Sequence, residues 1–307
     1  MEASLALVLN TVLLRSYVFA FLLVYLLGCS LHLGVKRAVI FCVAGYLIAW
    51  LSEYSSIHNG IPYGHYYYIE RTRDKELWVL GVPLMDSLSY VFLAYASYSM
   101  AIMIISPLLR VGRTVYILET KKIRNSLTTT ALGAILFVYL DIIIDPVALL
   151  GDKWFLGQIY GYPDGGIYFG VPISNFLGWL IVGFLLIYAL QKIDGLLHMR
   201  PDWSGGRYRW RYLIGPALYC AVIIFNLCVT FYIHEYNLAW VGIFIVVLPL
   251  TVLYYLLKIK LYPRDFSNAL KAHISDFPQA TIPGYTKREA HILDDGSVNH
   301  VRTVDLK

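Results

Sequence analysis

Charged residues are scarce in this chain: 15% of its 307 residues are Asp, Glu, Lys or Arg, whereas soluble domains carry about 25%. Hydrophobic residues account for 58%, and the mean hydropathy is +0.61. Long apolar runs fill the first 258 residues. This composition excludes a soluble enzyme, a disordered chain and a collagen-like chain, and it indicates a polytopic membrane protein.

Motifs for metals and common cofactors are also lacking. The four cysteines lie in or beside apolar runs and form no CxxC or Cys/His metal spacing, which excludes a disulfide scaffold. The eight histidines form no HxxxH or HxxHH pattern, which argues against a di-iron membrane hydroxylase. There is no P-loop and no GxSxG elbow. We therefore expect neither a metal nor another cofactor. Because the lysines and arginines lie between apolar segments, we also expect no nucleic acid partner.

Several segments are long enough to cross a membrane, which takes about 20 mostly apolar residues. Seven candidates cover 5–28, 37–54, 78–105, 126–149, 171–190, 212–233 and 238–258. The first contains Arg15 near its middle. An alternative therefore has a span at 16–35, preceded by a surface or re-entrant helix at 3–14. The sequence predicts an all-α, polytopic integral membrane helical bundle with about seven transmembrane helices.

The lysines and arginines are unevenly divided between the loops. They concentrate at 28–37, 106–125 and 191–211 and just after the last span, and they are fewer in the intervening loops. The positive-inside rule then places the N-terminus outside and the C-terminus in the cytosol. Residues 1–258 form the predicted transmembrane domain. Residues 259–307 form a polar cytosolic tail from which we expect no chemistry.

A Gly-Val-Pro motif occurs twice. It stands at 81–83 and returns at 170–172, an offset of 89 residues, each time after a loop rich in glycine and aromatic residues. Proline is favoured at the first position of a helix, where its missing N–H needs no partner. We expect each motif to start the deep part of a helix, with irregular backbone before it that protein or a wet cavity must cover.

The two motifs sit within longer stretches that resemble each other. We interpret 37–105 and 126–190 as a parallel internal repeat, and the alternative is chance similarity between two apolar stretches. The offset relates Asp86 to Asn175 and Tyr90 to Trp179.

Acidic side chains occur inside the apolar segments, where they are costly and usually functional. Glu53 ends the second segment, and Asp86 lies in the third. Asp141 and Asp145 lie in the fourth, four residues apart and hence on one face of a helix. Asp145 precedes Pro146, so a helix end is an alternative explanation for it. Under the predicted topology all four acids lie in the outer half of the bilayer, where we expect one shared cavity.

Amides and aromatic rings accompany these acids. Interhelical hydrogen bonding is an alternative role for the amides, and an interfacial belt explains many of the 26 tyrosines. Such a belt does not explain Trp179, which lies inside a span one turn past Asn175. The residues that we expect to bind substrate are Asn175, Trp179, Tyr90, Tyr63, Tyr66 and Asn226.

Short motifs run through 40–260. They are Glu53; Gly60-x-Pro62-Tyr63-Gly64-x-Tyr66-x-Tyr68; Gly81-Val82-Pro83; Asp145-Pro146-Val147-Ala148; Gly151-x-x-Trp154; and Tyr168-Phe169-Gly170-Val171-Pro172-x-x-Asn175-Phe176-x-Gly178-Trp179. With these motifs the chain resembles the membrane carotenoid biosynthesis family that includes carotenoid 1,2-hydratases and the archaeal bisanhydrobacterioruberin hydratases. The resemblance implies an enzyme, a hydro-lyase that adds water to the terminal double bond of an acyclic carotenoid end, with no cofactor. It also implies a place in a prokaryotic cytoplasmic membrane.

The acids fit that chemistry, although the resemblance assigns no catalytic residue. Acid-catalysed hydration needs a carboxylic acid that protonates the alkene and a carboxylate that takes a proton from water. We expect Asp141 or Asp145 to be the acid and Glu53 or Asp86 to be the base. Asn175 would orient water, and the rings of Trp179 and Tyr90 would shield the cation.

Two other functions remain open at this point. One is a non-catalytic carrier or transporter of carotenoid or lipid, which would use the same cavity. The other is a prenyl-lipid enzyme that binds a magnesium diphosphate, although Asp141-x-x-x-Asp145 is a single aspartate motif and lies on the outer side. The expected partners are an acyclic carotenoid or other isoprenoid lipid as substrate, membrane lipid, and other carotenoid biosynthesis enzymes.

Overall fold

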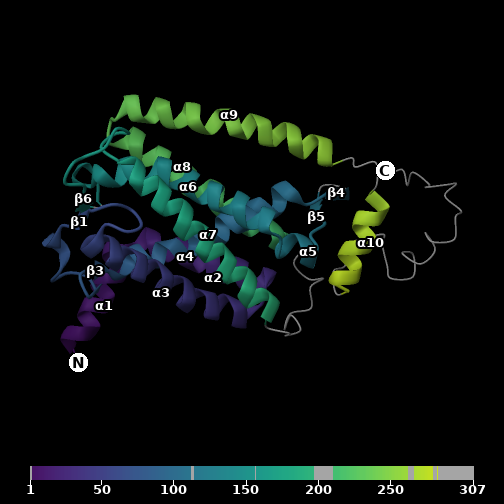
Figure 1. The fold of residues 1–307 in the computed structure, drawn as a ribbon, viewed down its shortest axis with the longest axis horizontal. Helices are drawn as coiled ribbons and strands as arrows, with labels where there is room; N and C mark the ends of the chain where they lie inside the picture. Colours follow the sequence, from purple (N-terminus) through teal and green to yellow (C-terminus); the bar gives the residue numbers. More distant parts are fainter. Residues whose placement is uncertain are drawn as a thin grey trace, which may run out of the picture.

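The computed structural model describes residues 2–111, 114–155, 157–196, 210–261, 266–278 and 282, and it is a bundle of long helices (Figure 1). The long helices are α2 (Ser16–His32), α3 (Val35–Asn59), α4 (Leu84–Ile105), α6 (Leu127–Leu149), α7 (Ile173–Leu196), α8 (Ile214–Tyr232) and α9 (Tyr236–Lys260). The shorter ones are α1 (Glu2–Leu14), α5 (Lys121–Arg124), α10 (Phe266–Asp276) and the 3-10 turns η1 (Glu70–Thr72), η2 (Gly151–Lys153) and η3 (Arg211–Leu213).

Short strands form three antiparallel pairs in the described part of the chain. The pairs are β1 (Tyr67–Tyr68) with β6 (Tyr160–Gly161), β2 (Trp78–Val79) with β3 (Val82–Pro83), and β4 (Leu108–Val111) with β5 (Thr114–Ile117). The first pair joins two loops that are far apart in the sequence, whereas the other two pairs are local hairpins.

The helices confirm the predicted polytopic membrane bundle. Within the described residues, six helices are each long and apolar enough to cross a membrane, and a bent pair made of α1 and α2 is a further candidate. The two helices of this pair meet at an angle of 86°. The expected uninterrupted helix over 5–28 is therefore wrong, and two separate helices on either side of Arg15 agree with the alternative. Which part of this bent pair crosses the membrane stays a prediction.

The bend at Arg15 is explained by a distant partner. Arg15 is fully buried, and its guanidinium donates to both carboxylate oxygens of Glu76, from Nε over 2.8 Å and from Nη2 over 2.6 Å. Thr72 also donates to Glu76, and the backbone N–H of Leu77 donates to Thr11 Oγ1 over 2.9 Å. A buried charge requires a close opposite charge, so the break between α1 and α2 brings Arg15 to the loop that carries Glu76.

The helix α4 lies at the centre of the bundle. It packs against α2, α3, α6 and α8, and most of its side chains are buried. By contrast, α9 lies along one edge (Figure 1), and its buried residues are Leu238, Ala239, Gly242 and Val246. The apolar outer surfaces of α9 and α3 suit contact with lipid tails.

Both Gly-Val-Pro motifs precede a helix, as predicted. The helix α4 begins at Leu84, immediately after Pro83, and α7 begins at Ile173, immediately after Pro172. The expected third span began at residue 78, which is wrong because residues 78–83 form the β2–β3 hairpin and the helix starts only after it.

The turns at the two motifs have the same backbone geometry. Leu80 and Gly81 have φ values of 50° and 85°, and Phe169 and Gly170 have φ values of 48° and 87°. Two consecutive positive φ values are typical of a two-residue hairpin turn of type I′. The flanking residues pair accordingly, Val79 with Val82 and Tyr168 with Val171. The two turns thus match at the predicted offset, whereas the repeat of the whole units stays a prediction.

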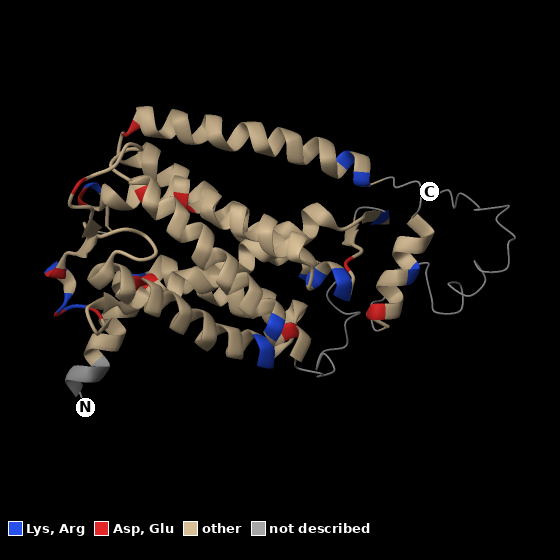
Figure 2. Ribbon diagram, viewed as in Figure 1, with Lys and Arg blue, Asp and Glu red and all other residues tan. Residues whose placement is uncertain are grey.

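The two ends of the bundle differ. We call the end with the loops 60–83 and 150–172 the loop end, and the end with β4, β5, α5 and α10 the hairpin end (Figure 1). Most of the described lysines and arginines lie at these ends rather than along the middle, while some acids lie inside the bundle near the loop end (Figure 2). The helix α10 belongs to the segment predicted as a polar tail, and its Leu270 and Ile274 pack with Leu118 of the hairpin end.

A close contact between α7 and the loop after α3 gives a testable prediction. A Cβ atom added to Gly178 would lie 2.5 Å from Cδ1 and 2.8 Å from Cα of Tyr63, so backbone would have to move. We expect Gly178→Ala to cost about 1–3 kcal/mol, as overpacking does. In the same helix, a Cβ on Gly195 would meet its nearest atom, Oδ1 of Asn125, at 3.6 Å, which is ordinary contact. Thermal unfolding in detergent should show a lower midpoint for Gly178→Ala but not for Gly195→Ala, and equal midpoints would contradict the close packing.

Candidate active site

The four acids predicted from the sequence lie in three neighbouring helices near the loop end. Glu53 comes from α3, Asp86 from the first turn of α4, and Asp141 and Asp145 from α6. Glu53, Asp141 and Asp145 are buried, with 1%, 1% and 4% of their surface exposed, and Asp86 is half-buried. Asp86 lies at the start of α4, and Asp141 and Asp145 lie near the end of α6. Because α4 packs against α6, these three acids lie at the same end of the bundle.

One amide connects the two acids of α6. The Nδ2 atom of Asn175 in α7 donates to Oδ2 of Asp141 over 2.8 Å and to Oδ2 of Asp145 over 3.0 Å. An amide NH2 group has two hydrogens to donate, so this one side chain holds both carboxyl groups. Among the described residues, the buried Oδ1 atom of Asp141 has no hydrogen-bond partner.

Tyrosines from the loops bind two of the acids. Asp145 accepts hydrogen bonds from Tyr160 and, over 2.9 Å, from Tyr162, and Asp86 accepts one from Tyr68 over 2.7 Å. Tyr68 also accepts from the hydroxyl of Tyr66 over 3.3 Å. Burial raises the pKa of Tyr68 and Tyr160 well above the ordinary value of a phenol, so both remain proton donors.

These tyrosine contacts depend on the pairing of two distant loops. In the β1–β6 pair, Tyr68 lies opposite Tyr160. Tyr68, Tyr160 and Tyr162 lie in the aromatic loops seen in the sequence, but their place at the site was not predicted. The signal was their place in the two loops that precede the Gly-Val-Pro motifs.

Glu53 has a partner that the sequence analysis missed. Ser87, the residue after Asp86 in α4, donates its hydroxyl hydrogen to Oε2 of Glu53. Glu53 does not line the cavity described below, whereas Asp86 does. The two acids predicted as alternative bases therefore differ in their access to a ligand.

A cavity of about 100 Å³ lies among α2, α4, α6 and α8. Its polar wall carries Asp86 and Ser89 from α4, Asp141 and Asp145 from α6, and Asn226 from α8. The other walls are apolar or aromatic, and they include Tyr17, Val18, Phe21, Met85, Phe92, Leu93, Ile144, Ala148, Trp154, Ile159, Tyr160, Trp179, Val222 and Phe225. Three carboxyl groups thus face one small space with mostly apolar walls.

Aromatic rings support this space from the side of α7. Trp179 lines the cavity and stacks on Tyr90, with ring centroids 4.6 Å apart and an interplanar angle of 22°. The ring centroids of Phe137 and Trp179 lie 4.7 Å apart. Tyr63 lies behind Tyr90, at 6.3 Å between ring centroids. Such stacking fixes the orientation of the Trp179 ring.

The other residues predicted to bind substrate have different surroundings. Asn226 lines the cavity, although its Nδ2 donates to the carbonyl of Val222 in its own helix over 2.9 Å. Asn175, Tyr90, Tyr63 and Tyr66 are not among the residues that line the cavity, and they contact residues near it. The structure thus places Asn226 and Trp179 at the cavity and the other four behind it.

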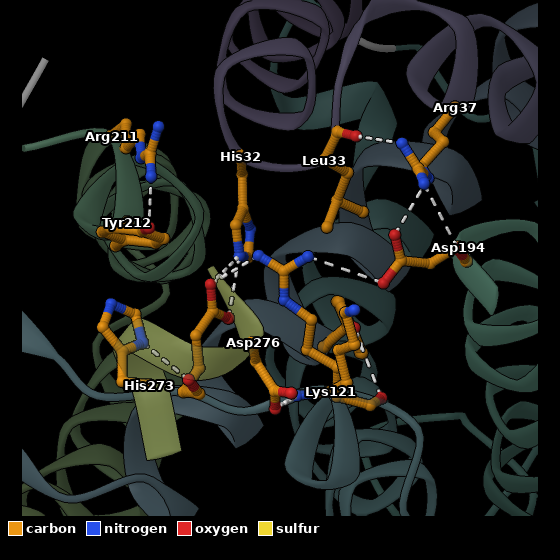
Figure 3. A network of polar contacts seen from close by, with 12 residues as sticks. His32, Leu33, Arg37, Lys121, Asp194, Arg211, Tyr212, His273 and Asp276 are labelled. Atoms are coloured by element: carbon orange, nitrogen blue, oxygen red, sulfur yellow. Dashed lines mark hydrogen bonds and ion pairs between the residues drawn. The ribbon is translucent and has the colours of Figure 1, made fainter. Parts of the chain in front are cut away.

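Figure 3 shows a second polar cluster. It lies at the hairpin end, and none of its residues lines the cavity. Its centre is Glu119, which is fully buried and binds Nε2 of His32 over 3.0 Å and the guanidinium of Arg124. Asp194 binds Arg124 over 3.5 Å and Nε of Arg37 over 2.9 Å. Burial alone would raise the pKa of Glu119, but the charges of Arg124 and His32 hold this pKa well below its usual range.

The helix α10 contacts this cluster. Its His273 is buried, and Nδ1 of this residue lies 2.6 Å from the backbone carbonyl oxygen of Glu119. Asp276 accepts from the backbone N–H of Lys121 over 2.8 Å (Figure 3). Burial lowers the pKa of His273, so the neutral ring is favoured where it docks. The cluster joins α10 to the bundle and shares no residue with the cavity.

Comparison with known proteins supplies the family. The model of the carotenoid biosynthesis protein family matches residues 4–249. This chain belongs to the carotenoid biosynthesis protein family. The match covers every helix that lines the cavity, whereas α10 lies beyond it. Searches of curated proteins and of solved structures gave no match. Family membership gives this membrane protein a role in carotenoid biosynthesis, with a carotenoid or another isoprenoid as its substrate.

Proposed function

We propose that this protein adds water to the terminal C=C bond of an acyclic carotenoid end group and produces a tertiary alcohol. The observation that carries the proposal is the carboxyl group of Asp141. It is buried, it lines a small cavity with mostly apolar walls, and its Oδ1 atom has no partner among the described residues. Such a group can present a proton to an alkene that has no polar atom of its own.

The reaction consists of two bond-forming steps. The carboxylic acid transfers its proton to the less substituted alkene carbon, so that a C–H bond forms, the π bond breaks and a tertiary cation remains. A lone pair of water then forms the C–O bond. The oxonium then loses a proton to a second carboxylate. The cycle closes when a proton passes, directly or through water, from this second group to the carboxylate that acted as the acid, and the net reaction consumes one alkene and one water. No electron is gained or lost, so the reaction requires no oxidant or reductant.

The hydrogen bonds favour Asp141 rather than Asp145 as the acid. Asp145 accepts hydrogen bonds from Tyr160, Tyr162 and Asn175, an arrangement that suits a carboxylate. Asp141 accepts only the bond from Asn175 among the described residues, which leaves Oδ1 to carry the proton. In this proposal Asp145 stays ionised and stabilises the developing positive charge.

Access to the cavity favours Asp86 rather than Glu53 as the base. Asp86 lines the cavity and keeps a partly exposed surface, whereas Glu53 is bound to Ser87 and does not reach the cavity. The hydrogen bond from Tyr68 restrains the carboxylate of Asp86 at the cavity wall. The ring of Trp179 lines the same space, where its π electrons stabilise a cation.

The distribution of charge supports an orientation. We propose that the loop end faces the outside and the hairpin end faces the cytosol, because the hairpin end carries Arg110, Lys121, Lys122 and Arg124. The acids then lie in the outer half of the membrane, and α10 lies on the cytosolic side.

Expression in lycopene-producing bacteria tests the proposed reaction. The pigments would be separated by chromatography, and their masses would be measured by mass spectrometry. We expect products heavier than lycopene by one or two waters, and none in cells with the empty vector. Unchanged lycopene in membranes that contain the folded protein would contradict hydration. If that lycopene also copurified with the protein, the result would favour a carrier.

A further inference from the structure

We propose that a long acyclic isoprenoid enters the cavity sideways from the lipid, between α2 and α8, through an aromatic gate formed by Tyr17, Phe21 and Phe225. Only its terminal unit occupies the cavity, and the rest of the chain lies across the gate. This inference rests on the proposed hydration for the identity of the substrate. The route itself rests on the geometry of the cavity walls.

The size of the cavity limits what it holds. A cavity of about 150 Å³ accommodates a benzene ring, and the cavity here measures about 100 Å³. It therefore has room for roughly one five-carbon end group and not for a polyene. The remainder of a long substrate must cross one of the cavity walls.

Most of the walls are unsuited to such a crossing. The wall formed by α4 and α6 carries Asp86, Asp141 and Asp145, which an apolar chain passing over them would deprive of water. Toward the loop end the cavity is covered by residues of the paired loops, among them Tyr160. On the side of α7 the wall is formed by Trp179, which stacks on Tyr90 and is 8% exposed.

The wall between α2 and α8 has the opposite character. It consists of apolar and aromatic side chains, and Tyr17, Phe21 and Phe225 are each half-buried while lining the cavity. Each of these rings thus lines the cavity and is only partly covered by other residues. The neighbouring residues Ala20 in α2 and Ile224 in α8 are exposed, on surfaces that a membrane would cover.

The contacts across this wall are made by rings. Tyr17 and Phe225 stack with centroids 5.4 Å apart and an interplanar angle of 15°, and Phe21 meets the ring of Phe225 edge-on at 5.7 Å. Stacked rings can part by side-chain rotation on a fast time scale, with both helices left in place. Flat π surfaces also suit the conjugated chain of a polyene.

The seam between α6 and α7 is closely packed at two glycines. There, a Cβ on Gly133 would lie 2.7 Å from Ile187, and a Cβ on Gly183 would lie 2.6 Å from Phe137. The two helices are therefore in close contact at both glycines.

The seam between α2 and α8 is equally close at Gly28, where a Cβ would lie 2.7 Å from Ile214. Beside the cavity, however, this seam is closed by the rings of Tyr17, Phe21 and Phe225, and this part of it is the proposed gate.

Cysteine labelling at the gate tests the route. Phe225→Cys would be made in a background in which the native Cys42, Cys220 and Cys228 are replaced by alanine, while Cys29 is fully buried and remains. The matched control is Ile224→Cys, whose position is adjacent in α8 and 59% exposed. Both purified variants would be treated with N-(1-pyrenyl)maleimide, a bulky apolar thiol reagent, and assayed with lycopene before and after labelling.

We expect the label on Phe225→Cys to lower the rate of lycopene hydration at least tenfold relative to the same variant unlabelled. The label on Ile224→Cys should change the rate less than twofold. We also expect bound lycopene to slow the labelling of Phe225→Cys but not of Ile224→Cys. If Phe225→Cys does not fold, Phe21→Cys with Ala20→Cys as its control gives the same comparison.

The outcomes separate the gate from the reaction. If labelled Phe225→Cys hydrates lycopene as fast as the unlabelled variant, the gate is wrong and the hydration stands. If lycopene protects Phe225→Cys from the reagent but the wild-type protein forms no hydrated product, the route stands and the proposed function is wrong. Equal protection at both positions would overturn the gate.

Discussion

Asp141→Asn is expected to lower the rate of lycopene hydration by about 100-fold to 10,000-fold, the usual contribution of a positioned general acid. Asparagine has nearly the same shape as aspartic acid, and its carbonyl oxygen can still accept the hydrogen bond from Asn175. It has no acidic proton, so the first step of the proposed reaction loses its donor. Initial rates measured with purified protein and lycopene in detergent give this ratio directly.

The control for this variant is Asp164→Asn, the same substitution at an exposed position in the loop that precedes α7. It should keep the wild-type rate. Thermal unfolding of both variants shows whether a lost rate reflects lost structure. A full rate in Asp141→Asn would remove this residue from the mechanism.

Glu119→Ala is expected to cost about 3–5 kcal/mol of stability, because it leaves buried positive charge without its partner. Glu119 is fully buried between His32 and Arg124, and its backbone carbonyl contacts His273 of α10. The midpoint of thermal unfolding in detergent should fall clearly. Because the cavity lies near the other end of the bundle, the hydration rate at low temperature should remain within a few-fold of wild type.

Glu70→Ala provides the comparison for this second prediction. Glu70 pairs with Arg73 on the surface, and more than half of each side chain is exposed. Exposed pairs contribute about 0–1 kcal/mol, so this variant should unfold close to the wild-type temperature. If the two variants unfold at the same temperature, the buried cluster has no special role in stability.

Much of the fold could be predicted from the sequence because the bilayer imposes a simple requirement, a run of about 20 apolar residues for each span. The first span was the exception. The break at Arg15 depends on Glu76, which follows it by 61 residues, and an apolar run gives no sign of such a pair. Likewise, residues 78–83 are apolar enough to extend a helix, but the turn at Gly81 makes them a hairpin.

The candidate site could be predicted only in part. Acids are rare in apolar helices, so the candidates Asp86, Asp141 and Asp145 stood out, and the structure places them around one cavity. The tyrosines that bind them did not stand out individually, because their positions depend on the β1–β6 pairing across 92 residues. The cluster at Glu119 gave no signal either, because its charged residues looked like those of ordinary solvated loops.

The two polar clusters explain why this fold tolerates so much buried charge. At the hairpin end, acids and bases neutralise one another, as in the contacts of Glu119 with Arg124 and of Asp194 with Arg37. At the cavity, the hydrogen-bond partners of Asp141 and Asp145 within the described part of the chain are neutral amide and phenol groups. A set of acids without close basic partners is costly for stability, and it is the arrangement that proton transfer to an alkene requires.

The origin of the added oxygen tests the central claim most directly. Purified protein would be incubated with lycopene in detergent, in air, in water enriched in ¹⁸O, and the product would be weighed by mass spectrometry. The proposed hydration predicts a mass gain of about 20 per reacted end in labelled water and about 18 in ordinary water, since the whole of one water molecule is added. A product that gains the same mass in both waters, or that contains no oxygen from water, would contradict it.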